Sequence, residues 1–496
     1  MKLQKAFSIL SIVCVFAMAL ASCKRDAEPK NADQTSTTTT TTSTTTTTTT
    51  NSTTTPYRDV FGFFGPQWFV DYTLKQSCGN APANRSVGDS AGNTHRAADN
   101  GSGERITINL LSFSDEVQNL IKEYMQTHPE ENICLDSTVH ASSNPGYQPT
   151  LNAALNSDAV DIYAAEAAYV LSYSKGRYED MALPYENLIT NFDSKLEAAQ
   201  IAPYMKQLGS NSQGKVVALG YQSTGCCFIY RRSLAKKIFG SDDPEVIAQK
   251  IGADTGNFDK FFEAAAECKK HNVSILSSLG DLYRMVEPSS TSPWVNENYD
   301  IDLDSSRKAF FDYAKTFWDN GWVNNEKDWN DDWYFDMKGM NGSYGDWAVC
   351  LAPVSSYWGG TWIFASAHLN DTGNEAKKAA VAKIIEYITL NTTNQGCLYK
   401  WANGSLTNGI KFSVPSAVVM NAVDGSSELC GGQNIFELFV QSDQKASGLL
   451  QTLFDEEINN EWKKQAVLYA TGKKTKDAAI QDFKDEMVSY GLICVE

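Results

Sequence analysis

The alternation of apolar and polar positions becomes regular only from Arg105 onward. The run RITINLLSF is apolar and rich in β-branched residues, which predicts a strand. After it, apolar residues recur every three or four positions and form one helical stripe, made of Val117, Leu120, Ile121, Tyr124 and Met125. Pro129 ends this helix, and NICLDSTVH predicts a second strand. A strand–helix–strand order is typical of a parallel sheet in an α/β protein.

The carboxyl ends of such parallel strands indicate where a ligand binds, because ligands of open α/β sheets lie in the crevice beyond them. Ser112 and Ser114 follow the first predicted strand, beside the start of the helix, where backbone N–H groups lack partners. We therefore expect both serines to contact a ligand.

The first 104 residues follow a different pattern. Residues 1–22 combine Lys2 and Lys5 with a short apolar run, which is typical of a secretory signal peptide and too short for a spanning helix. Leu-Ala-Ser-Cys closes this segment and resembles the lipobox of bacterial lipoproteins. That resemblance implies that Cys23 becomes an acylated N-terminus that anchors the protein in a membrane. An ordinary signal peptide with an incidental cysteine is the alternative.

Residues 23–104 predict a tether. Residues 35–55 are nearly all Thr and Ser, and residues 79–104 are rich in small polar residues, so we expect flexible linkers. Between them, YRDVFGFFGPQWFVDY at 57–72 is aromatic enough to pack on the body of the protein or on a partner. The pattern does not choose between these two roles.

Composition narrows the classes of function. The chain has 496 residues, 42% of them hydrophobic, and a length that favours two lobes. Its formal net charge of −17 makes nucleic acid and anionic membrane surfaces poor partners. There are only 5 His, without an HExxH motif, and the 11 Cys include no CxxC pair. We expect no catalytic residue, no metal and no cofactor, and a monomer.

Several later segments occur in a recognisable order. They are TLNAALNSDAVDIYAAEAAYV, GRYEDMALPYENL, QGKVVALGYQSTGCCFIYRRSL, YDIDLDSSRKAFFDYAKTFWDNGWV, APVSSYWGGTWIFASAHLNDTGNEAKKAAVAKIIEYI, NGIKFSVP and TGKKTKDAAIQDFKDEM. As an ordered set they resemble the extracellular solute-binding proteins of bacterial ABC importers, the group that includes maltose- and oligosaccharide-binding receptors. The resemblance covers residues 105–496, and a member of this family that binds a solute other than a carbohydrate would fit the same pattern.

The resemblance implies the periplasmic-binding-protein fold, an α/β fold with two lobes. Each lobe would hold a parallel-type sheet with helices on both faces, and three crossovers would join the lobes around a ligand cleft that closes by hinge motion. We expect residues 105–218 and 356–411 in the first lobe, and residues 219–355 and 412–496 in the second.

The resemblance also implies ligand contacts at three polar positions. Asp161 stands at the Asp of the family's "pDv" strand, Glu166 lies just beyond it, and Tyr221 lies on the first crossover. That crossover departs from the family pattern, because Gly220 replaces a proline and Arg231 stands where asparagine is common.

The stretch SSYWGGTWIFAS would cross between the lobes at the cleft wall. Gly359 and Gly360 permit positive φ and the close approach of a ligand. A sugar has apolar C–H faces and a rim of hydroxyls, so its site needs aromatic rings beside polar groups. The aromatic candidates are Tyr357, Trp358, Trp362 and Trp333. A place in the core, or on a surface helix for Trp333, is the alternative for these rings.

These observations together predict a lipid-anchored, non-enzymatic receptor at the cell envelope, facing the periplasm or the cell exterior. It would capture a mono- or oligosaccharide and deliver it to an ABC permease. A surface adhesin, favoured by the long Thr-rich tether, is one alternative. A secreted glycosidase is less well supported, because no pair of carboxylates stands out as a catalytic signature.

Overall fold

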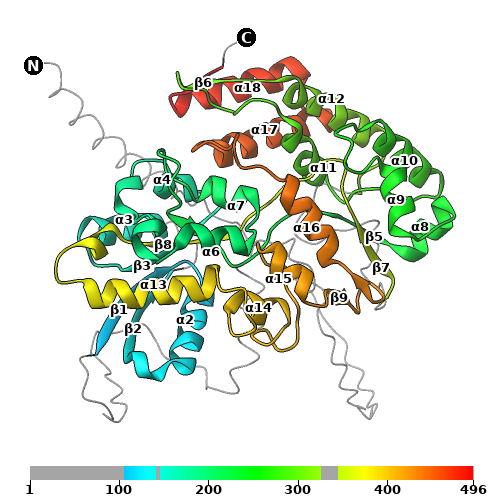
Figure 1. Cartoon of the computed structure of the whole chain (residues 1–496). Coiled ribbons are helices and arrows are strands. Elements are labelled where there is room, and N and C mark those ends of the chain that lie inside the picture. The colour runs from blue at the N-terminus through cyan, green and yellow to red at the C-terminus, as the bar shows by residue number, and fades with distance from the viewer. Residues whose placement is uncertain (1–104, 141–145, 325–344, 495–496) are drawn as a thin grey trace, which may run out of the picture. The chain divides into compact units, whose positions relative to one another are not determined.

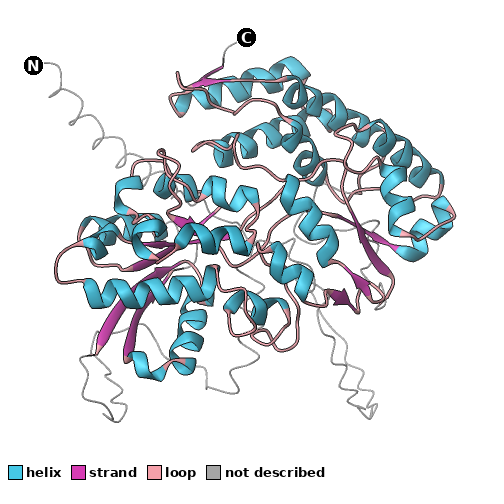
Figure 2. Ribbon diagram, in the orientation of Figure 1, coloured by secondary structure: helices cyan, strands magenta, loops and turns pink. Residues whose placement is uncertain are grey.

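The computed structural model of the chain describes residues 105–140, 146–324 and 345–494. Its largest sheet has five strands in the order β2-β1-β3-β8-β4. They are β1 (Ile106–Ser112), β2 (Ile133–Val139), β3 (Ile162–Glu166), β4 (Ala218–Leu219) and β8 (Thr361–Ala365). β1 is parallel to β2 and to β3, whereas β8 runs antiparallel to its neighbours β3 and β4. The sheet is therefore mixed, with a late segment of the chain inserted between two early ones. Its strands are drawn in magenta in Figure 2.

The unit formed by β1, α2 (Glu116–Thr127) and β2 confirms the predicted strand, helix and strand. The predicted stripe of α2 is its buried face, with Val117, Leu120, Ile121 and Tyr124 inside. α2 and α13 (Glu375–Thr389) both pack against β1 (Figure 1). β3 and β8 are buried almost throughout, as expected for strands covered on both faces.

Further helices accompany this sheet. The helices are α3 (Tyr147–Asn156), α4 (Val170–Ser174), α5 (Tyr185–Leu188), α6 (Phe192–Ala199), α7 (Pro203–Leu208) and α14 (Cys397–Ala402). The 3₁₀ turns of the described chain are Pro129–Glu131, Glu179–Met181, Glu287–Ser289 and Ala367–Asn370.

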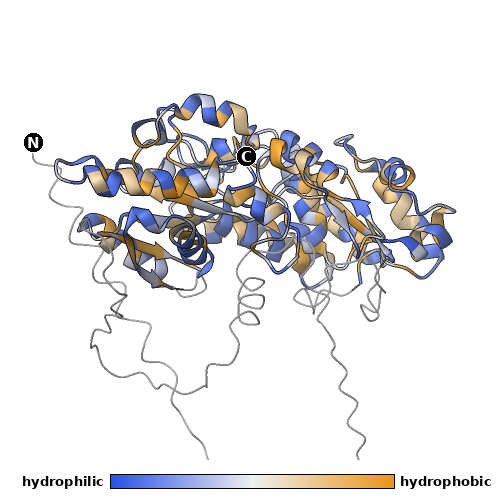
Figure 3. Ribbon diagram, turned by 60° about the horizontal axis from the view of Figure 1, so that its bottom comes forward, coloured by the Kyte–Doolittle hydropathy of each residue, from blue (hydrophilic) through white to orange (hydrophobic). Residues whose placement is uncertain are grey.

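The remaining described residues are mostly helical. The helices are α8 (Arg232–Phe239), α9 (Pro244–Ile251), α10 (Asp259–Lys270), α11 (Leu279–Val286), α12 (Ser305–Asp319), α15 (Ala417–Ala422), α16 (Phe436–Lys445), α17 (Asp455–Ala470) and α18 (Lys476–Ser489). α17 packs between α12 and α18, and Trp462 of α17 meets Trp294 with ring centroids 5.9 Å apart. In Figure 3 the hydrophobic positions gather on the strands and on single faces of the helices.

The strands of this second group are short. They are β5 (Phe228–Arg231), β6 (Asp300–Ile301), β7 (Trp347–Cys350), β9 (Ser426–Ser427), β10 (Gln433–Asn434) and β11 (Ile493–Cys494). β5 and β7 form an antiparallel pair, and parallel pairing is confined to β6 with β11 and to a bridge between Leu276 and Val323. In the described residues, this differs from the second parallel-type sheet that we expected, because Ser-rich and polar segments interrupt the runs that could pair.

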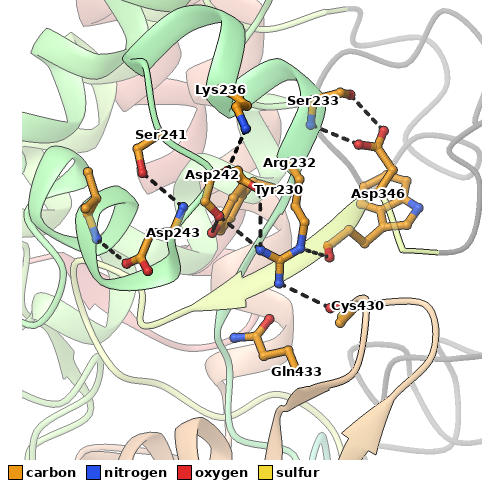
Figure 4. Close-up of polar contacts among 12 residues, drawn as sticks. Tyr230, Arg232, Ser233, Lys236, Ser241, Asp242, Asp243, Asp346, Cys430 and Gln433 are labelled. Carbon is orange, nitrogen blue, oxygen red and sulfur yellow. Dashed lines mark hydrogen bonds and ion pairs between the residues drawn. The ribbon is translucent and has the colours of Figure 1, made fainter.

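Arg232 ties the β5–β7 pair to its surroundings (Figure 4). Its Nε donates to the carbonyl oxygen of Trp347 at 3.1 Å, and its Nη1 and Nη2 donate to those of Asp242 and Cys430 at 3.1 and 3.2 Å. One planar guanidinium thereby satisfies three backbone acceptors from separate segments. None of the helices that the structure describes is both long and apolar enough to cross a membrane.

Asp161 precedes β3 and is fully buried. Its carboxylate accepts hydrogen bonds from the backbone N–H of Asn109 at 2.7 Å, from His368 Nε2 at 3.0 Å and from Lys377 Nζ at 3.2 Å. Burial raises the pKa of Asp161, but the bonds from His368, Asn109 and Lys377 outweigh it and hold the pKa below its ordinary value. The expectation that Asp161 contacts a ligand is therefore corrected, because it lies at the amino end of β3 and protein groups occupy its oxygens.

Replacing Asp161 with Asn should lower the free energy of unfolding by on the order of 3 kcal/mol, because it leaves the partners of a buried ion pair uncompensated. The depressed pKa also means that the contribution of Asp161 is present above the pKa of the unfolded chain and is lost as the pH falls through the folded value. Urea unfolding measures both effects. Asp158→Asn, at a side chain that is 70% exposed, is the control and should change little. Equal stability of Asp161→Asn and the native protein would contradict this reading.

Candidate functional site

The segment with Gly359 and Gly360 lies between the end of β3 and Thr224. The backbone N–H of Trp358 donates to the carbonyl oxygen of Thr224 at 3.0 Å, and that of Ala167 donates to the carbonyl oxygen of Gly360 at 3.3 Å. Both glycines have positive φ, 74° and 119°. This conformation, which suits glycine, lets the backbone turn between two partners before it enters β8.

Trp358 offers an exposed aromatic surface at this turn. Its side chain is 39% exposed, and the Arg284 guanidinium of α11 lies 4.3 Å from the ring centroid. Burial lowers the pKa of Arg284 from its ordinary value. The pair combines a flat apolar surface with a planar group of hydrogen-bond donors, drawn from segments far apart in the chain.

Tyr357, beside it, is held by protein contacts. Its ring stacks on Tyr204 with centroids 4.6 Å apart and an interplanar angle of 4°, and its hydroxyl donates to Gln451 Oε1. Gln451 Nε2 in turn donates to the carbonyl oxygen of Ala167 at 2.9 Å. Tyr357 therefore links the glycine turn to the segment before α17, and only a part of its half-buried surface is open to a ligand.

Trp362 lies in β8 with no exposed surface, and its Nε1 donates to the carbonyl oxygen of Met205 at 2.9 Å. The expectation that Trp362 contacts the ligand is corrected by this placement. β8 is covered on both faces, so every side chain in it is inside the protein. Trp362 is a core residue.

A buried carboxyl group lies where the predicted serines are. Glu116, the first residue of α2, is 2% exposed. The Tyr221 hydroxyl donates to its Oε2, and Gln222 Nε2 donates to its Oε1 and Oε2 at 3.1 and 3.0 Å. Burial raises the pKa of Glu116 to about 8, against the hydrogen bonds from Tyr221 and Gln222. The neighbouring Asp115 carboxylate raises it further.

Polar atoms around Glu116 lack hydrogen-bond partners within the described part of the chain. They are Ser114 Oγ, Asp115 Oδ1 and Gln222 Oε1. Ser114 is 6% exposed, and its backbone N–H donates to Ser112 Oγ at 3.4 Å. Buried polar atoms in folded proteins are almost always hydrogen-bonded, so unpaired ones mark a position where a ligand or an ordered water completes the bonds.

The structure thus brings together part of the predicted set. Tyr221 donates to Glu116, and Ser112 and Ser114 shortly precede Glu116 in the chain at the carboxyl end of β1. Glu166 is the half-buried last residue of β3, paired with Thr361 at the β8 end next to Gly360. Trp333 and Cys23 lie outside the described residues. In the described ranges, no three His, Cys, Asp or Glu side chains come together to hold a metal ion.

Glu116, Gln222, Arg284 and Gln451 were not predicted from the sequence. An acidic residue in the first turn of a helix is common because it complements the helix dipole, so Glu116 had an ordinary explanation. Arg284 and Gln451 stand in segments that carry no motif, and only the folded chain brings them to the glycine turn.

Comparison with known proteins gives the fold. No protein-family model and no curated protein matches the chain. A solved structure described as an extracellular solute-binding protein family 1 has a TM-score of 0.62 at 16% identity, over 77% of this chain and 99% of its own. The galacto-N-biose-/lacto-N-biose I-binding protein of the ABC transporter from Bifidobacterium longum has a TM-score of 0.54 at 14% identity, over 80% of this chain and 100% of its own. The sugar-binding protein MalE from Xanthomonas citri has a TM-score of 0.55 at 13% identity, over 77% of this chain and 98% of its own.

These likenesses confirm the fold that the order of segments implied. The chain has the two-lobed fold of extracellular solute-binding proteins, with helices and sheets in both parts.

Replacing Glu116 with Gln should remove a pH dependence of stability. Because the pKa of Glu116 is raised to about 8, the folded chain holds a proton that the unfolded chain loses near pH 4.3, and stability falls as the pH rises between these values. The expected slope is on the order of 1 kcal/mol per pH unit, measured by urea unfolding from pH 5 to pH 9. Glu116→Gln should lack this part of the decline, while Asp443 and Asp455, whose pKa burial raises to about 7, keep theirs. Glu197→Gln, at an exposed position on α6, should keep the native profile. Parallel profiles for all three proteins would refute the assignment.

Proposed function

We propose that this chain is the substrate-binding receptor of an ABC importer and that it captures a mono- or oligosaccharide by hinge closure. The fold supports a binding protein, because the neighbours that share it are described as solute- or sugar-binding proteins. One of them is a complex with lacto-N-biose. The receptor would pass its solute to a membrane permease and perform no chemistry on it.

The observation that carries the proposal is the pairing of two surfaces at one end of the large sheet. Trp358 supplies a partly exposed aromatic face beside the glycine turn. Ser114 and Gln222 supply unpaired polar atoms at the carboxyl end of β1 and on the segment after β4. A saccharide needs this combination, because its ring faces are apolar and its rim consists of hydroxyl groups.

The proposal includes three crossovers between the lobes, at residues 219–226, 354–361 and 411–416. Hydrogen bonds between these segments support it. The backbone N–H of Ser223 donates to the carbonyl oxygen of Ser413 at 3.1 Å, and Ser413 Oγ donates to that of Ser223 at 3.3 Å. With crossovers there, the lobe boundaries are those expected from the sequence, and bending of these segments would close the cleft.

We also propose the lipid anchor and the tether that the sequence predicts at the N-terminus. Cys23 would carry the lipid anchor, and residues 24–104 would form the tether that holds the receptor near its permease. The receptor would act in the periplasm or at the cell exterior as a monomer.

Titration of residues 24–496 with mono- and oligosaccharides tests the function, with intrinsic tryptophan fluorescence and calorimetry as readouts. We expect saturable binding of one class of saccharide. Trp358→Ala should weaken it at least tenfold, because the ligand loses its aromatic surface. Tyr490→Ala, which removes a 49% exposed ring at the end of α18, is the control and should bind as the native protein does.

Two results would refute this function. If the folded protein binds no saccharide, the receptor function is refuted. Shortening of an oligosaccharide during the titration would instead favour a glycosidase.

A further inference from the structure

We infer that the wall formed by Ser114, Asp115, Glu116 and Gln222 takes the hydroxyl groups of an uncharged saccharide, and that Glu116 keeps its proton in the complex. The inference rests on the proposed function and names the charge class of the solute. It also makes capture of the solute depend on pH.

Among the described residues, no cation contacts Glu116 to hold it as a carboxylate. The titratable groups that act on it are Asp115 beside it, Tyr221 from the segment after β4 and Cys397 from α14. In the described residues none of its hydrogen bonds comes from Lys or Arg; the donors are Tyr221 and Gln222. A fully buried carboxylate without a counter-ion is unfavourable, so the group stays protonated near neutral pH.

The three atoms without hydrogen-bond partners determine which hydrogen-bonding groups the solute has to present. Asp115 Oδ1 and Gln222 Oε1 are acceptors, and Ser114 Oγ can accept or donate. A solute that satisfies them has to present hydrogen-bond donors, as sugar hydroxyls do. An anionic group would face the Asp115 carboxylate and the Gln222 amide oxygen, which repel it, so acidic sugars are excluded.

The aromatic surface of the site, formed by Trp358 and Arg284, disfavours a cationic solute. The Arg284 guanidinium lies over one face of the Trp358 ring, 4.3 Å from its centroid, and places a positive charge beside the aromatic surface. A positive solute would meet the Arg284 charge at the ring, and a negative one would meet the Asp115 carboxylate at the wall. An uncharged polar molecule is the one that fits both surfaces.

The test is calorimetric titration of residues 24–496 with neutral, cationic and anionic probes. Maltose, lactose and cellobiose are neutral, glucosamine is cationic, and glucuronate is anionic. We expect binding from the neutral group only. Its affinity should be constant from pH 5.5 to pH 7 and fall by about tenfold per pH unit above about pH 8, as the proton leaves Glu116.

Glu116→Gln imitates the protonated carboxyl and should bind the neutral probe with an affinity that does not change up to pH 9.5. Glu197→Gln, an exposed carboxyl on α6, should keep the native pH profile. Because Glu116→Gln could fail to fold, a second measurement uses the native protein alone. Titration at pH 9 in buffers of different ionisation enthalpy should show uptake of up to one proton on binding, and at pH 6 none.

Preferential binding of glucosamine or glucuronate would overturn the inference and leave the receptor function intact. Binding of a neutral probe without proton uptake at pH 9, or with one pH profile for the native protein and Glu116→Gln, would also overturn it. A folded protein that binds none of the saccharides would refute the proposed function itself, and the inference with it.

Discussion

The insertion of β8 between β3 and β4 is the constraint on which the rest of the structure depends. β8 reaches the large sheet only after the chain has built α8 to α12 and the β5–β7 pair, and it then runs antiparallel to both neighbours. Its entry point is the turn at Gly359 and Gly360, which is bonded to Ala167 and Thr224. The register of β8 therefore determines where Trp358 lies, and it sets the aromatic surface beside the carboxyl ends of β1 and β3.

Two buried carboxyl groups at opposite ends of this sheet show how surroundings decide the role of an acidic residue. Asp161, at the amino end of β3, is met by His368 and Lys377 and remains charged, so it stabilises the fold. Glu116, after the carboxyl end of β1, accepts hydrogen bonds from the uncharged groups of Tyr221 and Gln222 and holds its proton. In the first arrangement protein donors occupy the oxygens of the carboxylate, and in the second neighbouring polar atoms have no hydrogen-bond partner in the described chain.

Much of the first lobe could be predicted from the sequence because its signals are local. The periodicity after Arg105 identified β1, α2 and β2, and the rule for parallel sheets placed Ser112 and Ser114 near Glu116 and its unpaired neighbours. The order of segments identified the fold, although no single motif did so.

The predictions that failed depended on information that is not local. TWIFA has no alternation of apolar and polar residues, so nothing in it shows that Trp362 faces the core rather than a ligand. Asp161 was assigned to the ligand because it matches the Asp of the family's strand pattern, but that pattern does not say which end of the strand meets the site. Arg284 and Gln451 come from distant segments, and their place beside Trp358 and Tyr357 follows only from the packing of both lobes.

A crystal structure of residues 24–496 with the tightest-binding saccharide tests the central claim most directly, because it locates the solute. The account predicts a sugar ring against Trp358, with hydroxyl groups that donate to Asp115 Oδ1 and Gln222 Oε1. A saccharide bound at any other position, with these oxygens paired to protein or water alone, would contradict it.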